Sequence, residues 1–422
     1  MQKEQARLLK RSLDKELIFE TTFEGVKEEE LYLWHLRPGA FNRLNPPWNP
    51  ARLLSAHPGV FDGAKVSLKV MGITWLLKHH DVIENIQFCD SQVKGPFFSY
   101  SHTHKFLSGG RLKDEIRFNA LGSSFIEKEL RRVFKFRHEA LRRDLAQHKN
   151  SRKLKFLITG ASGLVGSNLS SFLTSGGHEV DKLLRPKEWD GETRLDKDLG
   201  KYDCIVHLAG ENIADGRWTK NKKEKILNSR VKSTELLAKS IHSLSSKPYL
   251  ISASAIGFYG TKGEFDESSG NGEGFLADVV NRWEEAWGSL SVAKLRFGVI
   301  LSPLGGALKK LLIPFHFGLG GSIGNDSINW ISLDDVIYLI NKLSQEQTFN
   351  GALNVSQYVE DFSKTLGKVL NRPSFFKIPD FALNILFGEM ARETLLSQPK
   401  ISSSLNFVDH DLESYLRFCL GR

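Results

Sequence analysis

The chain has 422 residues, more than a single hydrophobic core usually organises, so two or more domains are expected. Hydrophobic residues make up 41% and charged residues 25%, which excludes a largely disordered chain. No run of 18 uncharged apolar residues is present and residues 1–15 are charged, so we expect neither a transmembrane segment nor a signal peptide, and we expect a cytoplasmic protein. The three cysteines Cys89, Cys204 and Cys419 are far apart, which excludes a disulfide framework and a cysteine zinc site.

The net charge of +9 is concentrated in the first part of the chain. Residues 1–150 hold 25 Lys and Arg against 18 Asp and Glu, and much of the excess lies in the helix-like stretch 131–143. A basic helix can attract nucleic acid or an anionic membrane. We favour a solvated helix face, and nucleic acid is not an expected partner.

The first 150 residues predict an α+β domain. Alternating apolar and polar residues predict strands at 16–24, 64–71, 73–88, 97–106 and 112–120. A long helix follows, because Ile126, Leu130, Phe134, Leu141 and Leu145 recur at helical spacing, as does Val133. This order predicts an antiparallel sheet wrapped around one helix, with a polar linker at 148–152.

Four histidines lie in the predicted strands of this region. His102 and His104 share one face of a strand, and His79 and His80 lie in another. A metal ion would need further ligands that the sequence does not place. We therefore interpret these histidines as structural and predict no metal site.

Beyond the linker, helical segments alternate with short apolar strands. The predicted strands are 155–159, 180–184, 204–208, 249–253, 295–301 and 353–355. Such alternation is typical of α/β proteins with a doubly wound parallel sheet, the Rossmann architecture.

A glycine-rich loop joins the first of these strands to a helix, in the sequence TGASGLVG (159–166). Gly160 permits a tight turn, Gly163 lets the backbone approach a pyrophosphate, and Gly166 allows the helix to pack closely on the strand. Ser162, Leu164 and Val165 complete the loop and the start of the helix, whose free N–H groups favour phosphate. The loop predicts a dinucleotide site.

The residue that ends the second strand predicts which dinucleotide binds. Sites that prefer NAD usually carry a carboxylate there for the ribose hydroxyls, whereas this chain has Arg185, with Lys187 nearby. A guanidinium can bind a 2′-phosphate through two hydrogen bonds. The predicted cofactor is NADP(H), although Arg185 could also be an ordinary surface arginine.

Ordered sequence blocks from about residue 154 to residue 420 closely resemble the atypical short-chain dehydrogenases known as epimerase-like oxidoreductases, some of which carry a cell-division-inhibitor label. The blocks are TGASGLVG (159–166), HLAGENI (207–213), SRVKSTELL (229–237), SASAIGFYG (252–260), NRWEEAW (281–287), LRFGVILSPLGGAL (295–308), PFHFGLGGSIG (314–324) and FGEMARETLL (387–396).

The resemblance implies further cofactor contacts and a domain plan. It implies that Ala209, Gly210 and Glu211 run beneath the ribose and nicotinamide, and that Val299 lies near the nicotinamide ring. It divides the chain into 1–150, an NADP-binding Rossmann domain at 153–371, and a small family-specific domain at 372–422. Residues 1–150 resemble the polyketide-cyclase/START-like (SRPBCC) superfamily, which implies a helix-grip domain for an apolar ligand.

The expected catalytic residues are present only in part. Short-chain dehydrogenases commonly use a Tyr-x-x-x-Lys pair with a Ser as hydrogen-bonding partner. Ser254 fits the Ser position, but the segment at 275–280 lacks the Tyr-Lys pair. Tyr259 is the nearest substitute for the missing tyrosine, and it could act either as a catalytic acid or as a packing residue.

These observations predict an NADP(H)-dependent oxidoreductase or epimerase-like enzyme that acts on an unidentified small substrate. The absent Tyr-Lys pair leaves open a cofactor-binding sensor or regulator without turnover. A third interpretation makes residues 1–150 a carrier of lipid or polyketide-like molecules.

Overall fold

The computed structural model describes residues 14–184, 189–190, 192, 195, 197–397, 399–405 and 410–422. The chain divides into two compact units. The first holds Met1–Asn150, Ser171–Gly177 and Gly421, and the second holds Ser151–Ser170, His178–Leu420 and Arg422. Among the described helices, none is long and apolar enough to cross a membrane.

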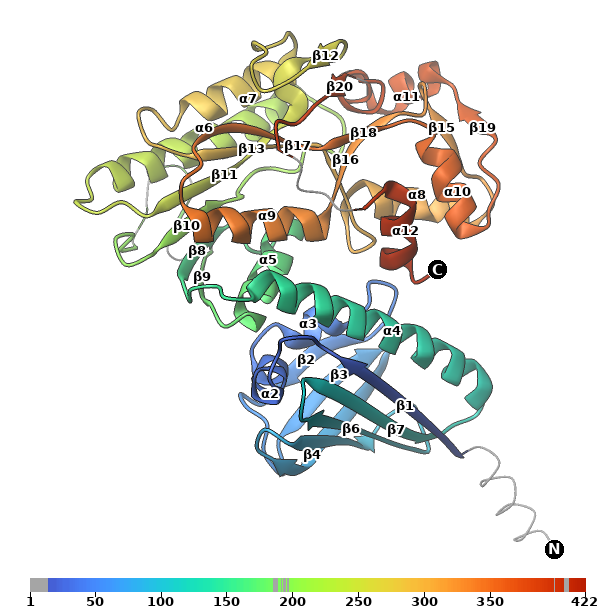
Figure 1. Cartoon of the computed structure of the whole chain (residues 1–422). Coiled ribbons are helices and arrows are strands. Elements are labelled where there is room, and N and C mark those ends of the chain that lie inside the picture. The colour runs from blue at the N-terminus through green and yellow to red at the C-terminus, as the bar shows by residue number, and fades with distance from the viewer. Residues whose placement is uncertain are drawn as a thin grey trace, which may run out of the picture. The chain divides into compact units, whose positions relative to one another are not determined.

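The first unit contains one antiparallel sheet of seven strands and three described helices (Figure 1). In spatial order the strands are β1 (Asp14–Thr22), β7 (Arg111–Asn119), β6 (Ser99–Leu107), β5 (Gln87–Lys94), β4 (Ile73–Ile83), β3 (Lys65–Val70) and β2 (Arg52–Ala56). The helices are α2 (Glu28–Leu36), α3 (Ala40–Leu44) and α4 (Ser123–His148). The predicted antiparallel sheet is therefore confirmed.

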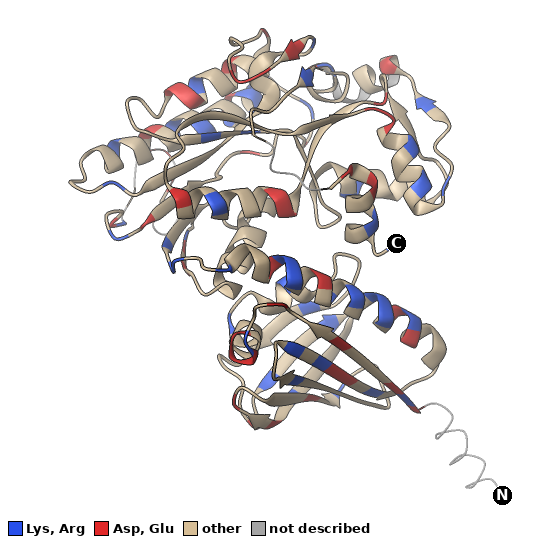
Figure 2. Cartoon of the chain, viewed as in Figure 1, with Lys and Arg blue, Asp and Glu red and all other residues tan. Residues whose placement is uncertain are grey.

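Helix α4 packs one face on this sheet, as its apolar spacing predicts. Phe134 is buried with Leu17, Ile116 and Phe118 of the strands. The outer face of α4 carries interspersed basic and acidic residues (Figure 2). Several of them pair along the helix, as Arg131 does with Glu127 at 2.8 Å. The positive charge of the helix is thus partly neutralised by its own carboxylates.

One predicted strand of this unit is in fact two. The stretch 73–88 contains β4, a turn, and the first residues of β5, which returns antiparallel to β4. Asn85 lies in the turn with a φ of 59°, a conformation that asparagine tolerates better than most residues. The prediction of one strand was wrong because the turn contains neither glycine nor proline.

The second unit is built on a parallel sheet of six strands. In spatial order these are β9 (Glu179–Leu183), β8 (Lys155–Thr159), β10 (Cys204–His207), β11 (Tyr249–Ala255), β13 (Ala293–Phe297) and β17 (Gly351–Val355). Helix α5 (Leu164–Ser175) begins in this unit, and its residues from Ser171 onward belong to the first. The other helices of the unit are α6 (Lys220–His242), α7 (Phe275–Glu285), α8 (Gly306–His316), α9 (Leu333–Glu346), α10 (Phe362–Leu370), α11 (Asp380–Phe387) and α12 (Leu412–Leu420). Two short helical turns, η1 (Ile256–Tyr259) and η2 (Ala391–Leu395), complete the set. The predicted Rossmann-like sheet is confirmed.

The predicted strand 295–301 breaks at Gly298. Its first part is β13, whereas β14 (Val299–Leu301) joins a separate sheet with β16 (Ile328–Ser332) and β18 (Gln357–Val359). A Cβ at Gly298 would lie 2.7 Å from the carbonyl oxygen of Asn329, so only glycine fits where the chain leaves the main sheet.

Two pairs of short strands complete the unit. Strand β12 (Glu264–Phe265) pairs with β20 (Lys400–Ile401), and β15 (Gly321–Ile323) pairs with β19 (Phe376–Ile378). The C-terminal helix α12 shares a hydrophobic cluster with α8 and α10, in which Leu308, Leu366 and Leu416 are fully buried. The C-terminal residues are thus part of the packing of the second unit.

Candidate nucleotide-binding site

The candidate site begins at the carboxyl end of β8, where the sheet order reverses. Strand β9 follows β8 in sequence and lies on one side of it, whereas β10 lies on the other. In open parallel sheets such a switch point leaves a crevice in which ligands bind. The loop 159–166 emerges at this point and leads directly into α5.

Two of the three glycines of this loop, Gly160 and Gly166, are required by the backbone around them. Gly160 has a φ of 66°, and a Cβ on it would lie 2.6 Å from the carbonyl carbon of Leu208. A Cβ on Gly166 would lie 2.4 Å from the carbonyl oxygen of Gly160. Gly163 donates its N–H to that same oxygen at 3.0 Å. The loop is therefore a tight turn that presses against the end of β10.

A threonine hydroxyl ties the ends of β8 and β10 together. The Thr159 Oγ1 accepts hydrogen bonds from the backbone N–H groups of Leu208 and Ala209, at 3.1 and 3.2 Å. The same oxygen lies 2.8 Å from Nδ1 of His207. Thr159 thus holds the segment that leads to Gly210 beside the glycine-rich loop.

The exposed part of the loop is available to a ligand. Ser162 and Gly163 are exposed, and Leu164 and Val165 are half-buried. The first turn of α5 begins at Leu164, so its N–H groups have no partner within the helix and carry the positive end of its dipole. This geometry suits the phosphates of a dinucleotide.

A segment from much later in the chain, after β14, also lies against the glycine-rich loop. The Leu164 side chain is within 3.3 Å of the position that a Cβ would take on Gly305. Gly305 follows β14, whose first residue Val299 is exposed. The structure therefore brings the segment after β14 next to the glycine-rich loop.

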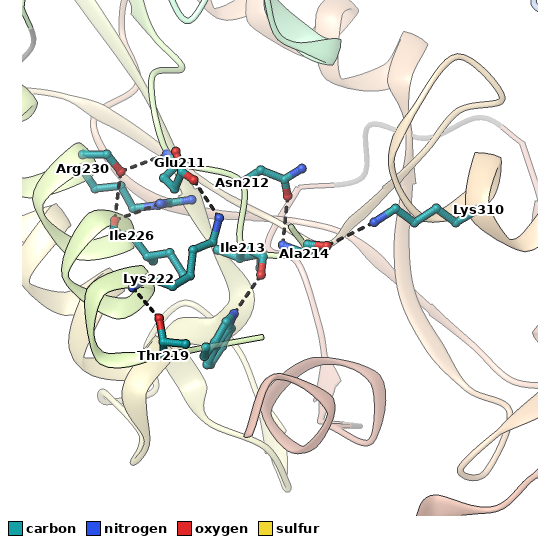
Figure 3. A network of polar contacts seen from close by, with 11 residues as sticks. Glu211, Asn212, Ile213, Ala214, Thr219, Lys222, Ile226, Arg230 and Lys310 are labelled. Atoms are coloured by element: carbon teal, nitrogen blue, oxygen red, sulfur yellow. Dashed lines mark hydrogen bonds and ion pairs between the residues drawn. The ribbon is translucent and has the colours of Figure 1, made fainter. Parts of the chain in front are cut away.

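Charged side chains surround the segment after β10 (Figure 3). The Lys222 ammonium donates to the Glu211 carboxylate at 2.7 Å, and this contact lowers the pKa of Glu211. A Cβ on Gly210 would lie 3.2 Å from the guanidinium carbon of Arg230, so that cation is next to the backbone of Gly210. Burial lowers the pKa of Arg230 to about 10, which leaves it protonated at neutral pH. Lys222 and Arg230 were not among the predicted site residues.

The two candidate catalytic hydroxyls lie together in a buried network. The Ser254 hydroxyl donates to Glu284 at 2.5 Å, and the Tyr259 hydroxyl donates to the Asn354 amide oxygen at 2.8 Å. Arg296 joins them, with two hydrogen bonds of 2.8 Å to Glu284 and one of 2.7 Å to the Tyr259 oxygen. Tyr259 is only 1% exposed. Each hydroxyl already has a protein partner.

Comparison with known proteins identifies the family. Residues 156–274 match the NAD dependent epimerase/dehydratase family. Epimerase family protein ML0860 of Mycobacterium leprae is 32% identical over 268 residues, which are 58% of this chain and 87% of that protein. The chain belongs to the epimerase family.

Two solved structures extend this relation within the epimerase family. The nucleoside-diphosphate sugar epimerase of Corynebacterium glutamicum is 26% identical, with a TM-score of 0.72 over 96% of this chain and 93% of that one. Human epimerase family protein SDR39U1, solved with NADPH, is 27% identical, with a TM-score of 0.56 over 62% of this chain and 98% of that one. The likeness to the Corynebacterium protein therefore includes residues of both units.

In this epimerase-family chain, Arg185 and its neighbour Lys187 lie outside the described residues. The roles of Ser254, Tyr259 and the cofactor-binding residues stay predictions. Arg230 and Gly210 are 20 residues apart in the sequence, and the fold is what brings the guanidinium next to the Gly210 backbone.

Proposed function

We propose that this epimerase-family protein binds NADP(H) at the loop 159–166 and acts as an oxidoreductase or epimerase-like enzyme. The observation that carries this proposal is the loop itself, in which the backbone around Gly160 and Gly166 leaves no room for a side chain. Its position at the switch point of a parallel sheet, ahead of the α5 N-terminus, matches the physical needs of a pyrophosphate.

The choice of NADP(H) over NAD(H) rests on Arg185 and on the human relative solved with NADPH. The guanidinium of Arg185, two residues after β9 in the sequence, would attract a 2′-phosphate, whereas a carboxylate would repel it. One charge-assisted contact contributes about 1.5–3 kcal/mol, so the preference should be about tenfold or more.

When bound, the nicotinamide would supply or accept a hydride. The substrate would lie beyond the carboxyl edge of the parallel sheet, beside Val299 and the segment 209–211, with residues 372–422 as its cover. In this arrangement Lys222 fixes the Glu211 carboxylate, and the Arg230 cation supports the backbone of Gly210.

For the first unit we propose a START-like domain that holds an apolar ligand and serves the reductase. Its antiparallel sheet and long packed helix support this proposal. The same feature supports a carrier of lipid or polyketide-like molecules. Native mass spectrometry of the purified protein tests both, because each requires the first unit to retain an apolar molecule.

A second candidate function is a cofactor-binding sensor without turnover. The buried network favours it, because Ser254 and Tyr259 both have protein partners for their hydroxyls. Oxidation of NADPH by the protein with any carbonyl compound would exclude it.

The experiment that tests the proposed function is calorimetric titration with NADPH and with NADH, using wild type, Arg185→Ala and Lys182→Ala. Lys182 is an exposed cation on β9 and serves as the control. We expect NADPH to bind more tightly than NADH, and Arg185→Ala to weaken NADPH binding about tenfold without changing NADH binding. If wild type binds neither nucleotide, the oxidoreductase proposal should be abandoned.

A further inference from the structure

The sheet of the first unit gathers imidazoles and carboxylates on its buried face. His79, His102, His104 and Asp114 are all at most 7% exposed, and Asp90 is half-buried among them. Buried polar groups of this kind are retained only where they have partners or bind an ion. The cluster has no part in the nucleotide site, which belongs to the second unit.

Strand register explains how these residues meet. Asp90 of β5 is directly opposite His79 of β4 on one side and His102 of β6 on the other. His104 follows two residues later on the same face and is opposite Asp114 of β7. Directly opposite residues in antiparallel strands have Cβ atoms about 5 Å apart, which is close enough for shared contacts.

Three of these residues form a ligand set. Asp90, His102 and His104 each offer one ligand atom, and these atoms all lie within 4.8 Å of one another. We propose that these three side chains bind a divalent transition-metal ion of the Zn²⁺ type. The sequence showed His102 and His104 but no third ligand, and the fold places Asp90 of the neighbouring strand β5 beside them.

The donor chemistry selects the class of metal. Imidazole nitrogen suits zinc, cobalt, nickel and copper, whereas calcium and magnesium prefer sets made only of oxygen. Two imidazoles and one carboxylate leave a coordination position open to water, as catalytic zinc sites do. The site would therefore bind the metal with room for one exchangeable ligand.

Asp114 occupies the position of a supporting carboxylate. Its Oδ1 is 2.9 Å from Nε2 of His102 and 2.7 Å from Nδ1 of His104. These contacts use Nε2 of His102 and Nδ1 of His104, so coordination through the other nitrogen of each ring would leave Asp114 as their shared partner. Ligating histidines usually give their second nitrogen to a carboxylate in this way.

A further histidine holds the Asp114 carboxylate in place. His138 of α4 contacts the other Asp114 oxygen at 2.6 Å and Oγ1 of Thr21 at 2.7 Å, which fixes the carboxylate in place.

The test uses the full chain without a polyhistidine tag, with Zn²⁺ in calorimetry and Co²⁺ as a spectroscopic probe. We expect one ion per chain, and visible Co²⁺ absorption bands that added Zn²⁺ removes. Asp90→Asn keeps the shape of the side chain but removes a charged ligand, so it should abolish the bands. Asp114→Asn changes a supporting residue and should weaken Zn²⁺ binding by about 10–100-fold.

His80→Gln is the matched control, because His80 is on the same strand as His79 but its side chain is 39% exposed and contacts Asp81 and Ser91. This variant should bind metal as wild type does. Circular dichroism establishes that each variant is folded, and NADPH titration should be unchanged in all of them. Absence of Co²⁺ bands in wild type, or the same bands and affinity in folded Asp90→Asn, would show that the cluster is only a hydrogen-bonded core.

Discussion

The glycine-rich loop follows β8, and Ser254 lies at the end of β11 in the same parallel sheet. The loop is formed by closely packed backbone, whereas the end of β11 is formed by hydrogen-bonded side chains. Gly160 lies against the backbone of Leu208, and Gly166 lies against the backbone of Gly160. Ser162 and Gly163 of the same loop are exposed. At the end of β11, Ser254 and the nearby Tyr259 are buried and hydrogen-bonded. The loop is preorganised for a ligand, whereas the hydroxyls of Ser254 and Tyr259 already have hydrogen-bond partners in the protein.

This difference separates cofactor binding from catalysis in the molecule. A site made of backbone N–H groups and a helix N-terminus can bind phosphate with little rearrangement. A buried tyrosine can give a proton to a substrate only if its partners Asn354 and Arg296 release it. The structure thus supports nucleotide binding more directly than it supports the catalytic roles predicted for Ser254 and Tyr259.

The largest effect is expected from Glu284→Gln, which breaks the buried network. Arg296 and Glu284 form two hydrogen bonds, and their side chains are only 5% and 10% exposed. Removing one charge leaves the other buried without its counter-ion, which costs about 3–5 kcal/mol. Urea unfolding followed by fluorescence measures this loss.

Glu264→Gln provides the control for that experiment. Glu264 pairs with Lys400 at 3.7 Å, and the two side chains are 79% and 59% exposed. Solvent screens such a pair, so its loss should cost no more than about 1 kcal/mol. Equal losses for the two variants would mean that the buried network does not stabilise this half of the site.

The contrast also explains which features the sequence could predict. The loop is local, since its glycines and its strand and helix lie within about 20 residues, and each glycine has a steric reason that is visible in the spacing. The network is not local. Tyr259 meets Asn354 across 95 residues, and Ser254 meets Glu284 across 30.

The first unit shows the same limit. Alternation predicted most of its strands, and helical spacing predicted α4, because both patterns follow from burial of one face. Which residues meet across strands depends on register, and register is set by turns such as the one at Asn85. Asp90 could therefore not be paired with His102 from the sequence, and the predicted absence of a metal site rested on that missing ligand.

Gly160→Ala should destabilise the protein less than Glu284→Gln does, but it should abolish NADPH binding. The new Cβ would lie 2.6 Å from the Leu208 backbone, in a left-handed conformation that alanine disfavours. Such strain costs about 1–3 kcal/mol, and relief of it would move the loop away from the end of β10. Calorimetric titration should detect no NADPH binding, and urea unfolding should give the loss of stability.

Gly270→Ala is the matched control for this substitution. Gly270 lies in the same unit, and a Cβ on it would meet no atom within 4 Å. Its stability and NADPH affinity should equal those of wild type. If Gly160→Ala also binds NADPH normally, the close approach of the loop to β10 is not what forms the cofactor site.

Tyr259→Phe removes one hydroxyl and should destabilise the protein no more than Gly160→Ala does, by about 1–3 kcal/mol. Burial raises the pKa of Tyr259, despite the hydrogen bonds from Arg296 and to Asn354. Because the folded state holds this proton more tightly, the contribution is present below the usual tyrosine pKa of about 10 and is lost as the pH rises above it. Wild type should therefore lose more stability than Tyr259→Phe between neutral pH and pH values above about 10, as urea unfolding at several pH values would show.

The same variant decides between the two roles that the sequence leaves open for Tyr259. General acid catalysis contributes about 10²–10⁴-fold to the rate. Loss of a hydrogen bond that only supports packing should change the turnover of the folded protein far less. If wild type oxidises NADPH with a carbonyl substrate and Tyr259→Phe retains that rate within a few-fold, the network is structural and the proton comes from another group. A loss of about 10²-fold or more, with NADPH affinity unchanged, would instead establish that the network opens and that Tyr259 reaches the substrate.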